Sequence, residues 1–167
     1  MIHFTKVYSK QQIADVSILA QEIWQEHYLH IIGQDQIDYM LKKFQSVQAI
    51  KTQLSDGYEY YSIFYYECHI GYISFISNMD DASLMISKLY VKKLNRGSGI
   101  GEQMLRFAEA LCLQRKIKKI WLTVNKYNKD SIAWYLKMGF TNKGPIVQDI
   151  GGGFAMDDLL MEKYIRS

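Results

Sequence analysis

A glycine-rich loop is the stretch of this sequence best suited to hold a phosphate. It reads Arg-Gly-Ser-Gly-Ile-Gly over residues 96–101, between an apolar run at 84–91 and an amphipathic run at 104–112. Glycines let the backbone approach a ligand closely and adopt positive φ. Because the loop opens into a predicted helix, its N–H groups and the positive end of the helix dipole would converge on one spot. Such a site suits a pyrophosphate, with Arg96 as a charged donor at its edge.

Two common phosphate-binding loops do not fit the spacing. A dinucleotide fingerprint has the pattern GxGxxG and an acidic residue at the end of the next strand. Here the glycines are Gly97, Gly99 and Gly101, and the next predicted strand is followed by Asn125. A P-loop needs GxxxxGK followed by Ser or Thr, which does not occur in the chain. A glycine-rich turn that binds nothing stays open as an alternative, because glycine patterns alone are weak signals.

Two further segments accompany the loop. The strand before it ends in Leu-Tyr-Val at 89–91, and residues 128–140 read N-K-D-S-I-A-W-Y-L-K-M-G-F. The loop also matches the pattern Q/R-x-x-G-x-G/A. Together these segments resemble the GNAT superfamily of N-acetyltransferases, with Ser131 where that family commonly has alanine. The resemblance covers nearly the whole chain, and the predicted order of elements is also the family's.

The resemblance implies a binding site for acetyl-coenzyme A. In GNAT proteins the loop holds the pyrophosphate, and the pantetheine arm lies where the strands before and after the next helix splay apart, paired with strand backbone. In this chain the implied cofactor-binding residues are Leu89, Tyr90, Val91, Arg96, Gly97, Ser98, Gly99, Ile100, Gly101, Glu102, Asn128, Ser131, Tyr135 and Lys137. No metal is expected, because His27 and His30 have no third ligand in view.

The resemblance also implies two catalytic groups. The backbone N–H of Val91 would polarise the thioester carbonyl and stabilise the oxyanion that develops on attack. Tyr135 matches the tyrosine that protonates the departing CoA thiolate. A phenol, with a pKa of about 10, can do this only when it is positioned against the sulfur. The alternative for Tyr135 is an ordinary core tyrosine.

The acceptor amine must lose a proton before it attacks. Holding an amine with a pKa of about 10.4 neutral at pH 7 costs roughly 4–5 kcal/mol, so a base is wanted. Many relatives carry a glutamate on the strand before the loop, whereas residues 84–88 hold no carboxylate. Lys88 would repel a cationic amine if it faced the site. The other candidates for the base are Glu22, Glu26 and His27 on the first predicted helix and Asp80 and Asp81 before the strand.

The acceptor pocket of GNAT proteins is walled by the first two helices and the last hairpin. Trp24 and Tyr28, four residues apart, would form one aromatic wall of it, and core packing is the alternative for Trp24. Asp157 and Asp158 are most simply turn residues, or else they rim a site that attracts cations. Residues 23–31 are similar to bacterial spermidine- or diamine-type acetyltransferases, which predicts a polyamine or other small amine. A peptide N-terminus, an aminoglycoside-like amine and a non-catalytic acyl-CoA sensor stay open.

The elements that must position these groups follow from periodicity and turn residues. The class is α+β, with a mixed, mostly antiparallel central sheet flanked by helices in the order β-αα-βββ-α-β-α-ββ. Strand, helix and strand over 84–124 form a right-handed crossover if the strands are parallel. The expected strands are 2–8, 58–66, 69–77, 84–91, 119–124, 140–147 and 159–165, and the expected helices are 10–31, 34–55, 100–115 and 130–138.

Composition narrows the function further. The 167 residues are enough for one N-acetyltransferase domain, residues 1–167, and the net charge of +3 is scattered, so no nucleic-acid partner is expected. Two cysteines without a CxxC partner predict a reducing cytoplasm. No signal peptide or uncharged stretch of about 18 residues is present, so no membrane contact is expected. Dimers are common in GNAT folds, although no stretch of this sequence marks an interface.

Overall fold

A computed structural model describes residues 1–166. Their contacts divide the chain into two units, the first made of Met1–Ile76 and Lys88–Met104 and the second of Ser77–Ser87 and Leu105–Ser167. Strand β4 (Ser83–Val91) and helix α4 (Ile100–Gln114) each contribute residues to both units. All seven strands pair antiparallel where their register is defined, except for β4 with β5, so the mixed α+β class expected from the sequence is confirmed.

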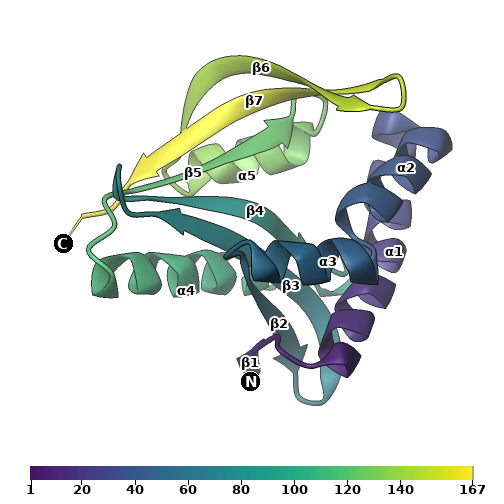
Figure 1. Cartoon of the computed structure of the whole chain (residues 1–167). Coiled ribbons are helices and arrows are strands. Elements are labelled where there is room, and N and C mark those ends of the chain that lie inside the picture. The colour runs from purple at the N-terminus through teal and green to yellow at the C-terminus, as the bar shows by residue number, and fades with distance from the viewer. Residues whose placement is uncertain (167) are drawn as a thin grey trace. The chain divides into compact units, whose positions relative to one another are not determined.

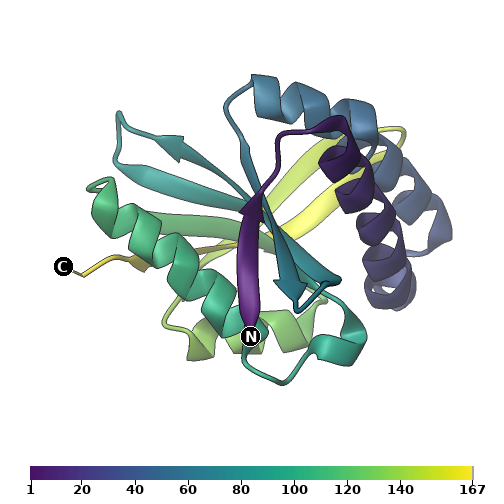
Figure 2. The ribbon, with the colours of Figure 1, turned by 90° about the horizontal axis from the view of Figure 1, so that it is seen from below.

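The first unit contains β1 (Ile2–Lys6), β2 (Glu59–Tyr65) and β3 (Cys68–Asn78) up to Ile76, followed in strand order by β4. Helix α1 (Lys10–Ile32) begins with a capping box between Ser9 and Gln12 and ends at Gly33, whose φ is +79°. It packs against α2 (Gln34–Phe44) and α3 (Val47–Ser55), and the three helices gather together in Figures 1 and 2.

The single helix expected at 34–55 is two helices. Ser46 interrupts it, because its side chain accepts a hydrogen bond from the N–H of Ala49 and so caps α3. The preceding Gln45 is 2% exposed, and its amide oxygen accepts from the Tyr72 hydroxyl while its carbonyl accepts from the Ser17 hydroxyl. These contacts with α1 and β3 satisfy the polar groups of the break.

The second unit contains β5 (Lys119–Asn125), α5 (Lys129–Lys137) and the hairpin of β6 (Thr141–Gly151) with β7 (Phe154–Tyr164), which is the long curved pair in Figure 1. The hairpin was expected around the same glycines but with shorter strands. Its polar residues between 148 and 158 indicate a loop in the sequence, and pairing from Val147–Asp157 to Gly151–Phe154 extends the ladder through them. Asp157 and Asp158 are therefore strand residues, and their prediction as turn residues was wrong.

The two faces of the β5–β7 ladder differ. Residues directly opposite one another in an antiparallel pair share a face. Ile120, Leu122 and Val124 lie opposite Lys163, Met161 and Leu159. Lys163 donates to the carbonyl of Met138 at the end of α5 and pairs with Glu109 of α4, so these two helices cover that face. The other face carries Trp121, Thr123 and Asn125 opposite Glu162, Leu160 and Asp158.

The parallel ladder between β4 and β5 is short. Its register joins Ser83 to Lys119, Leu84 to Ile120 and Met85 to Trp121. The antiparallel ladder between β5 and β7 runs on to Asn125, opposite Asp158. In the described chain, none of the helices combines the length and the apolar character that a bilayer crossing requires.

Candidate functional site

The glycine loop has the backbone geometry that its composition predicts. Gly97 and Gly99 have φ of +79° and +82°, and a Cβ built on either would meet no atom within 4 Å. Glycine is therefore needed at these positions for conformation and not for space. Helix α4 begins at Ile100, and its first backbone bond runs from Gln103 N to Gly99 O at 3.1 Å. The first N–H groups of a helix have no acceptor within the helix, so they are available to an anion.

Arg96 connects the loop with the end of β4 and with α1. Its Nε donates to the carbonyl of Val91 at 3.0 Å, and its Nη1 lies 3.3 Å from His27 Nδ1. The guanidinium thus holds the last residue of β4 from one side. Ser98 closes the loop by donating its hydroxyl to Asn95 O at 2.8 Å.

Gly71 on β3 sets how closely β3 and β4 approach one another. A Cβ at this position would lie 2.5 Å from the Tyr90 carbonyl oxygen and 3.4 Å from the Val91 Cα. Only glycine allows this approach without a backbone shift. Gly71 is not among the predicted site residues, although an isolated glycine inside a strand pattern is a signal of close backbone approach.

An aromatic cluster surrounds Tyr90 in the first unit. Trp24 is 4% exposed, and its ring centroid lies 4.5 Å from that of Tyr28 and 5.6 Å from that of Tyr90. The hydroxyls of Tyr28 and Tyr90 are 3.4 Å apart. Tyr72 joins the cluster from β3, and burial raises its pKa well above the usual value. Trp24 and Tyr28 therefore form one aromatic surface next to the end of β4, with Trp24 in the core and Tyr28 half-buried.

Lys88 is buried at 5% exposure, and its ammonium points into the first unit. It donates to the carbonyl of Phe44 at the end of α2, to Gln53 Oε1 of α3 at 3.0 Å and to the hydroxyl of Tyr60 on β2. Burial lowers its pKa from 10.5 to about 7. Lys88 was expected to repel a cationic amine if it faced the site. Its ammonium is instead bound by acceptors inside the first unit.

Three of the candidate bases on α1 and before β4 have other partners. Glu22 lies 3.4 Å from Lys92, and His27 contacts Arg96. Asp81 accepts from the hydroxyl of Ser83 at 2.6 Å, in the turn that leads into β4. Within residues 1–166 no three His, Cys, Asp or Glu side chains gather as ligands for a metal ion.

Helix α5 of the second unit carries the residues of the other motif. Asn128 is 5% exposed, and its side-chain oxygen accepts from Ser131 N at 3.4 Å, so it caps the helix. Tyr135 is 9% exposed, with its ring centroid 5.0 Å from that of Trp134 and 5.4 Å from that of Phe140. Lys137 is exposed in the last turn, where a cation favours the helix dipole.

Asp158 on β7 is a buried carboxylate of the second unit, at 4% exposure. Burial raises its pKa from 3.8 to about 6, a hydrogen bond from Thr123 opposes that rise, and the charge of Asp157 adds to it. Asp157 itself forms an ion pair with Lys126.

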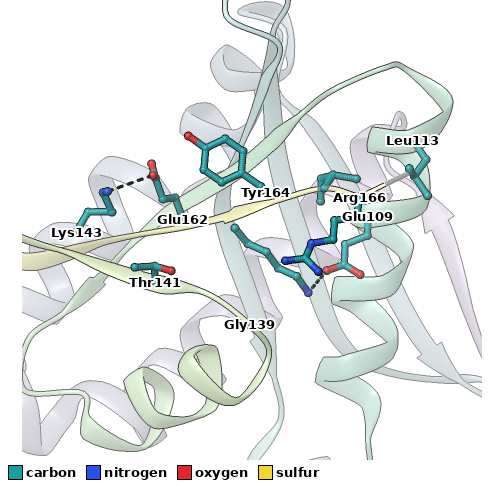
Figure 3. A pocket seen from close by; sticks show the side chains of 10 residues that line it. Glu109, Leu113, Gly139, Thr141, Lys143, Glu162, Tyr164 and Arg166 are labelled. Atoms are coloured by element: carbon teal, nitrogen blue, oxygen red, sulfur yellow. Dashed lines mark ion pairs between the residues drawn. The ribbon is translucent and has the colours of Figure 1, made fainter.

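A cavity of about 600 Å³ also lies in the second unit (Figure 3). Its walls come from α4, from the start of β6 and from the end of β7, and none of the predicted site residues lines it. Two ion pairs lie along it, Lys143 with Glu162 at 3.7 Å and Lys163 with Glu109, and Arg166 lines it as well.

Each unit therefore assembles one half of the predicted residues. The first brings the end of β4, Arg96, the glycine loop and the Trp24–Tyr28 surface together. The second brings Asn128, Ser131, Tyr135 and Lys137 together on α5.

Comparisons with known proteins identify the family. Residues 17–140 match the model of the acetyltransferase (GNAT) family. The fold is similar to that of the PaiA N-acetyltransferase of Thermoplasma acidophilum, solved in complex with coenzyme A. Its identity is 23% over 98% of this chain and 99% of that chain, with a TM-score of 0.79.

Two further solved structures share the fold. The ribosomal-protein-S18-alanine N-acetyltransferase of Escherichia coli is 13% identical over 100% of this chain and 96% of its own, with a TM-score of 0.74. A spermidine N-acetyltransferase SpeG chimera from Vibrio cholerae and hSSAT is 15% identical over 98% of this chain and 95% of its own, with a TM-score of 0.70. At these identities the likeness shows the fold alone.

Proposed function

This chain belongs to the acetyltransferase (GNAT) family and is an N-acetyltransferase that uses acetyl-CoA, and on that premise we propose that it acetylates a primary amine by direct attack in a ternary complex. The observation that carries the proposal is the glycine loop at the start of α4. Its two positive-φ glycines and the helix N-terminus make a cradle for the pyrophosphate of the donor. Arg96, fixed to Val91, supplies the positive charge beside it.

In the proposed reaction the donor supplies a thioester. The N–H of Val91 donates to the thioester oxygen, where negative charge grows as the amine attacks. Gly71 and Arg96 hold this strand end in place from two sides. Tyr135 donates its hydroxyl proton to the departing thiolate. Asn128 binds the cofactor arm, and Lys137 binds a phosphate of the donor.

We further propose that the acceptor is a polyamine or another small cationic amine. The half-buried ring of Tyr28, packed against Trp24 in the core, supports this, because aromatic faces attract ammonium groups. The spermidine acetyltransferase chimera among the similar structures agrees with it at the level of the fold. The cytoplasm is the proposed location, and the two cysteines, free in the described chain, are consistent with a reducing compartment.

The test is an assay of thiol release from acetyl-CoA over a panel of amines. The panel includes spermidine, a diamine, a peptide with a free N-terminus and an aminoglycoside. Tyr135→Phe is expected to lower kcat by about 100-fold while the protein still binds CoA, since a positioned acid contributes about that much. Tyr164→Phe, at an exposed tyrosine of the same unit, is the matched control and should keep wild-type activity.

An acyl-CoA sensor is the second candidate, and the absence of a carboxylate from residues 84–88 favours it. Calorimetry distinguishes the two functions, because a sensor binds acetyl-CoA without consuming it. A folded protein that binds CoA tightly and releases no thiol with any amine of the panel would refute the proposed enzyme.

A further inference from the structure

The three carboxylates in the middle and at the end of β7 have different surroundings. Glu162 lies between two lysines, 3.6 Å from Lys119 and 3.7 Å from Lys143. Asp157 pairs with Lys126 at the surface. Asp158 is the most buried of them, and the ion pairs formed within residues 1–166 leave it without a cation. A buried carboxylate that lacks a counterion costs stability, so its presence calls for a reason.

The backbone places Asp158 next to the start of α5. It lies opposite Asn125, the last residue of β5, and opposite Ile146 on its other side. The carbonyl of Asn125 accepts from the N–H of Asn128 at 2.9 Å, so one turn joins the partner of Asp158 to the cap of α5. Asn128 is a proposed contact of the cofactor arm. Asp158 is therefore paired with Asn125, the residue at which the turn to Asn128 begins. Both Asp158 and Asn128, the proposed donor-binding residue, belong to the second unit.

The sheet face of Asp158 is also informative. Helices α4 and α5 cover the face that carries Met161 and Lys163, and Asp158 lies on the opposite one with Thr123 and Asn125. Its neighbours there are the hydroxyl of Thr123 and the neutral side chain of Asn125, and Ile146 faces it from β6. The nearby charges are those of Asp157 and of its partner Lys126. Nothing in this set neutralises the carboxylate.

We propose that Asp158 is the general base that takes the proton from the ammonium of the acceptor amine, directly or through one water molecule. This inference rests on the proposed function. β4 has no carboxylate that could act as the base, and the charged residue it does carry, Lys88, is bound by Phe44 and Gln53 inside the fold. Asp158 fills this role. Its raised pKa keeps the group ionised at neutral pH yet able to accept a proton.

The proton balance of the proposed reaction is as follows for an amine R–NH3+. One proton moves from nitrogen to the Asp158 carboxylate, and the freed lone pair forms the C–N bond. The C–S bond breaks, and the thiolate takes the proton of the Tyr135 hydroxyl. The second proton of the nitrogen returns to Tyr135, and Asp158 releases its own to solvent. One proton therefore leaves the enzyme for each acetyl group transferred.

The test compares Asp158→Asn with wild type over a pH series, using the best alkylamine of the panel and 2,2,2-trifluoroethylamine, which is largely neutral at pH 7. With the alkylamine, kcat/KM at pH 7 is expected to fall by about 100-fold. The loss should shrink as the pH approaches the pKa of the amine, because solvent then removes the proton. With trifluoroethylamine the variant should stay close to wild type.

Two further variants separate a base from a structural residue. Thr123→Val keeps the carboxylate and removes the hydrogen bond that lowers its pKa, so the acidic limb of the wild-type profile should move to higher pH. Asp157→Asn removes the neighbouring carboxylate and should retain nearly all activity at pH 7. Calorimetry with CoA and thermal melting check that Asp158→Asn is folded.

The outcomes separate the two proposals. If wild type acetylates an amine and Asp158→Asn loses nothing, or loses the same factor with both amines at every pH, Asp158 is not the base. If wild type acetylates no amine in the panel, the proposed function itself fails, whatever the variants do.

Discussion

Lys88→Met isolates the energetic consequence of a buried cation. Lys88 is 5% exposed and donates to acceptors on α2, α3 and β2. Burial lowers its pKa from 10.5 to about 7. Between pH 7 and the ordinary pKa of lysine, the unfolded chain therefore keeps a proton that the folded chain has released. Stability rises with pH wherever the unfolded state binds more protons, so wild type should become more stable as the pH rises through this window.

The magnitude follows from these two pKa values. Between pH 7 and 8.5 the unfolded lysine stays charged, while its folded occupancy falls from one half to almost nothing. Integrating the difference gives about 1.6 kcal/mol of added stability from this one group. Lys88→Met abolishes that increment. It also leaves the Phe44 carbonyl without this donor, which costs about 1–3 kcal/mol at every pH. Gln53 and Tyr60 keep the hydrogen bond between them.

Urea unfolding at constant ionic strength, at several pH values from 7 to 8.5, measures this difference. The wild-type free energy of unfolding should climb relative to that of Lys88→Met by about 1.6 kcal/mol over the range. Lys118→Met, at an exposed lysine, is the control and should follow wild type. Contributions from other titrating groups cancel, because they are common to all three proteins. Parallel curves for wild type and Lys88→Met would show that burial does not depress the pKa of Lys88.

Two other predictions concern residues next to the proposed cofactor-binding groups, Gly71 in the first unit and Asn128 in the second. Gly71→Ala places a Cβ 2.5 Å from the Tyr90 carbonyl oxygen, so it should lower the free energy of unfolding in urea by about 1–3 kcal/mol. It should also raise the KM for acetyl-CoA, because it displaces the end of β4. Wild-type values for both quantities would contradict this. Asn128→Asp keeps an oxygen to cap Ser131 and loses the amide donor, so it should retain the melting temperature and raise the KM for acetyl-CoA. Asn128→Ala should lose the cap as well, at about 1 kcal/mol. A wild-type KM for acetyl-CoA in Asn128→Asp would argue against contact with the cofactor.

Local rules in the sequence were enough for much of the fold. The glycines at 97 and 99 need positive φ because the chain turns there into a helix, and that requirement depends on neighbours alone. Gly57 and Gly139 end helices with φ of +99° and +96°, as their positions after apolar periodic runs predict. The strand Lys119–Asn125 was also predicted, over 119–124, because that stretch is short and mostly apolar.

The features that the sequence did not predict depend on partners far along the chain. The break between α2 and α3 is stabilised by Tyr72, 27 residues from Gln45, and by Ser17, 28 residues away. Lys88 is buried because its acceptors come from elements at least 28 residues distant. These acceptors cannot be identified from the sequence alone. A lysine on a predicted strand is therefore expected to be exposed to solvent.

The hairpin of β6 and β7 was underestimated for a different reason. The residues by which its ladder extends, 148–151 and 154–158, mix polar and apolar side chains without strict alternation, so no apolar pattern distinguishes strand from loop there. The ladder continues because each strand supplies the backbone partners of the other. This extension turns Asp157 and Asp158 from loop residues into strand residues, and only then does Asp158 acquire a buried face and a neighbour at the end of β5.

The two buried ionisable groups, Lys88 and Asp158, both have strongly shifted pKa values, yet their surroundings imply different roles. Three acceptors surround the ammonium of Lys88, so its charge is used inside the fold. The carboxylate of Asp158 has one hydroxyl neighbour and no paired cation in the described chain, and the role proposed for it is that of the base. Their effects on stability also occupy separate ranges: Asp158 adds stability as the pH falls from about 6 toward 3.8, and Lys88 adds it as the pH rises above about 7. The acidic limb of the rate profile should therefore respond to Asp158 and Thr123, whereas the alkaline rise in stability should respond to Lys88 alone.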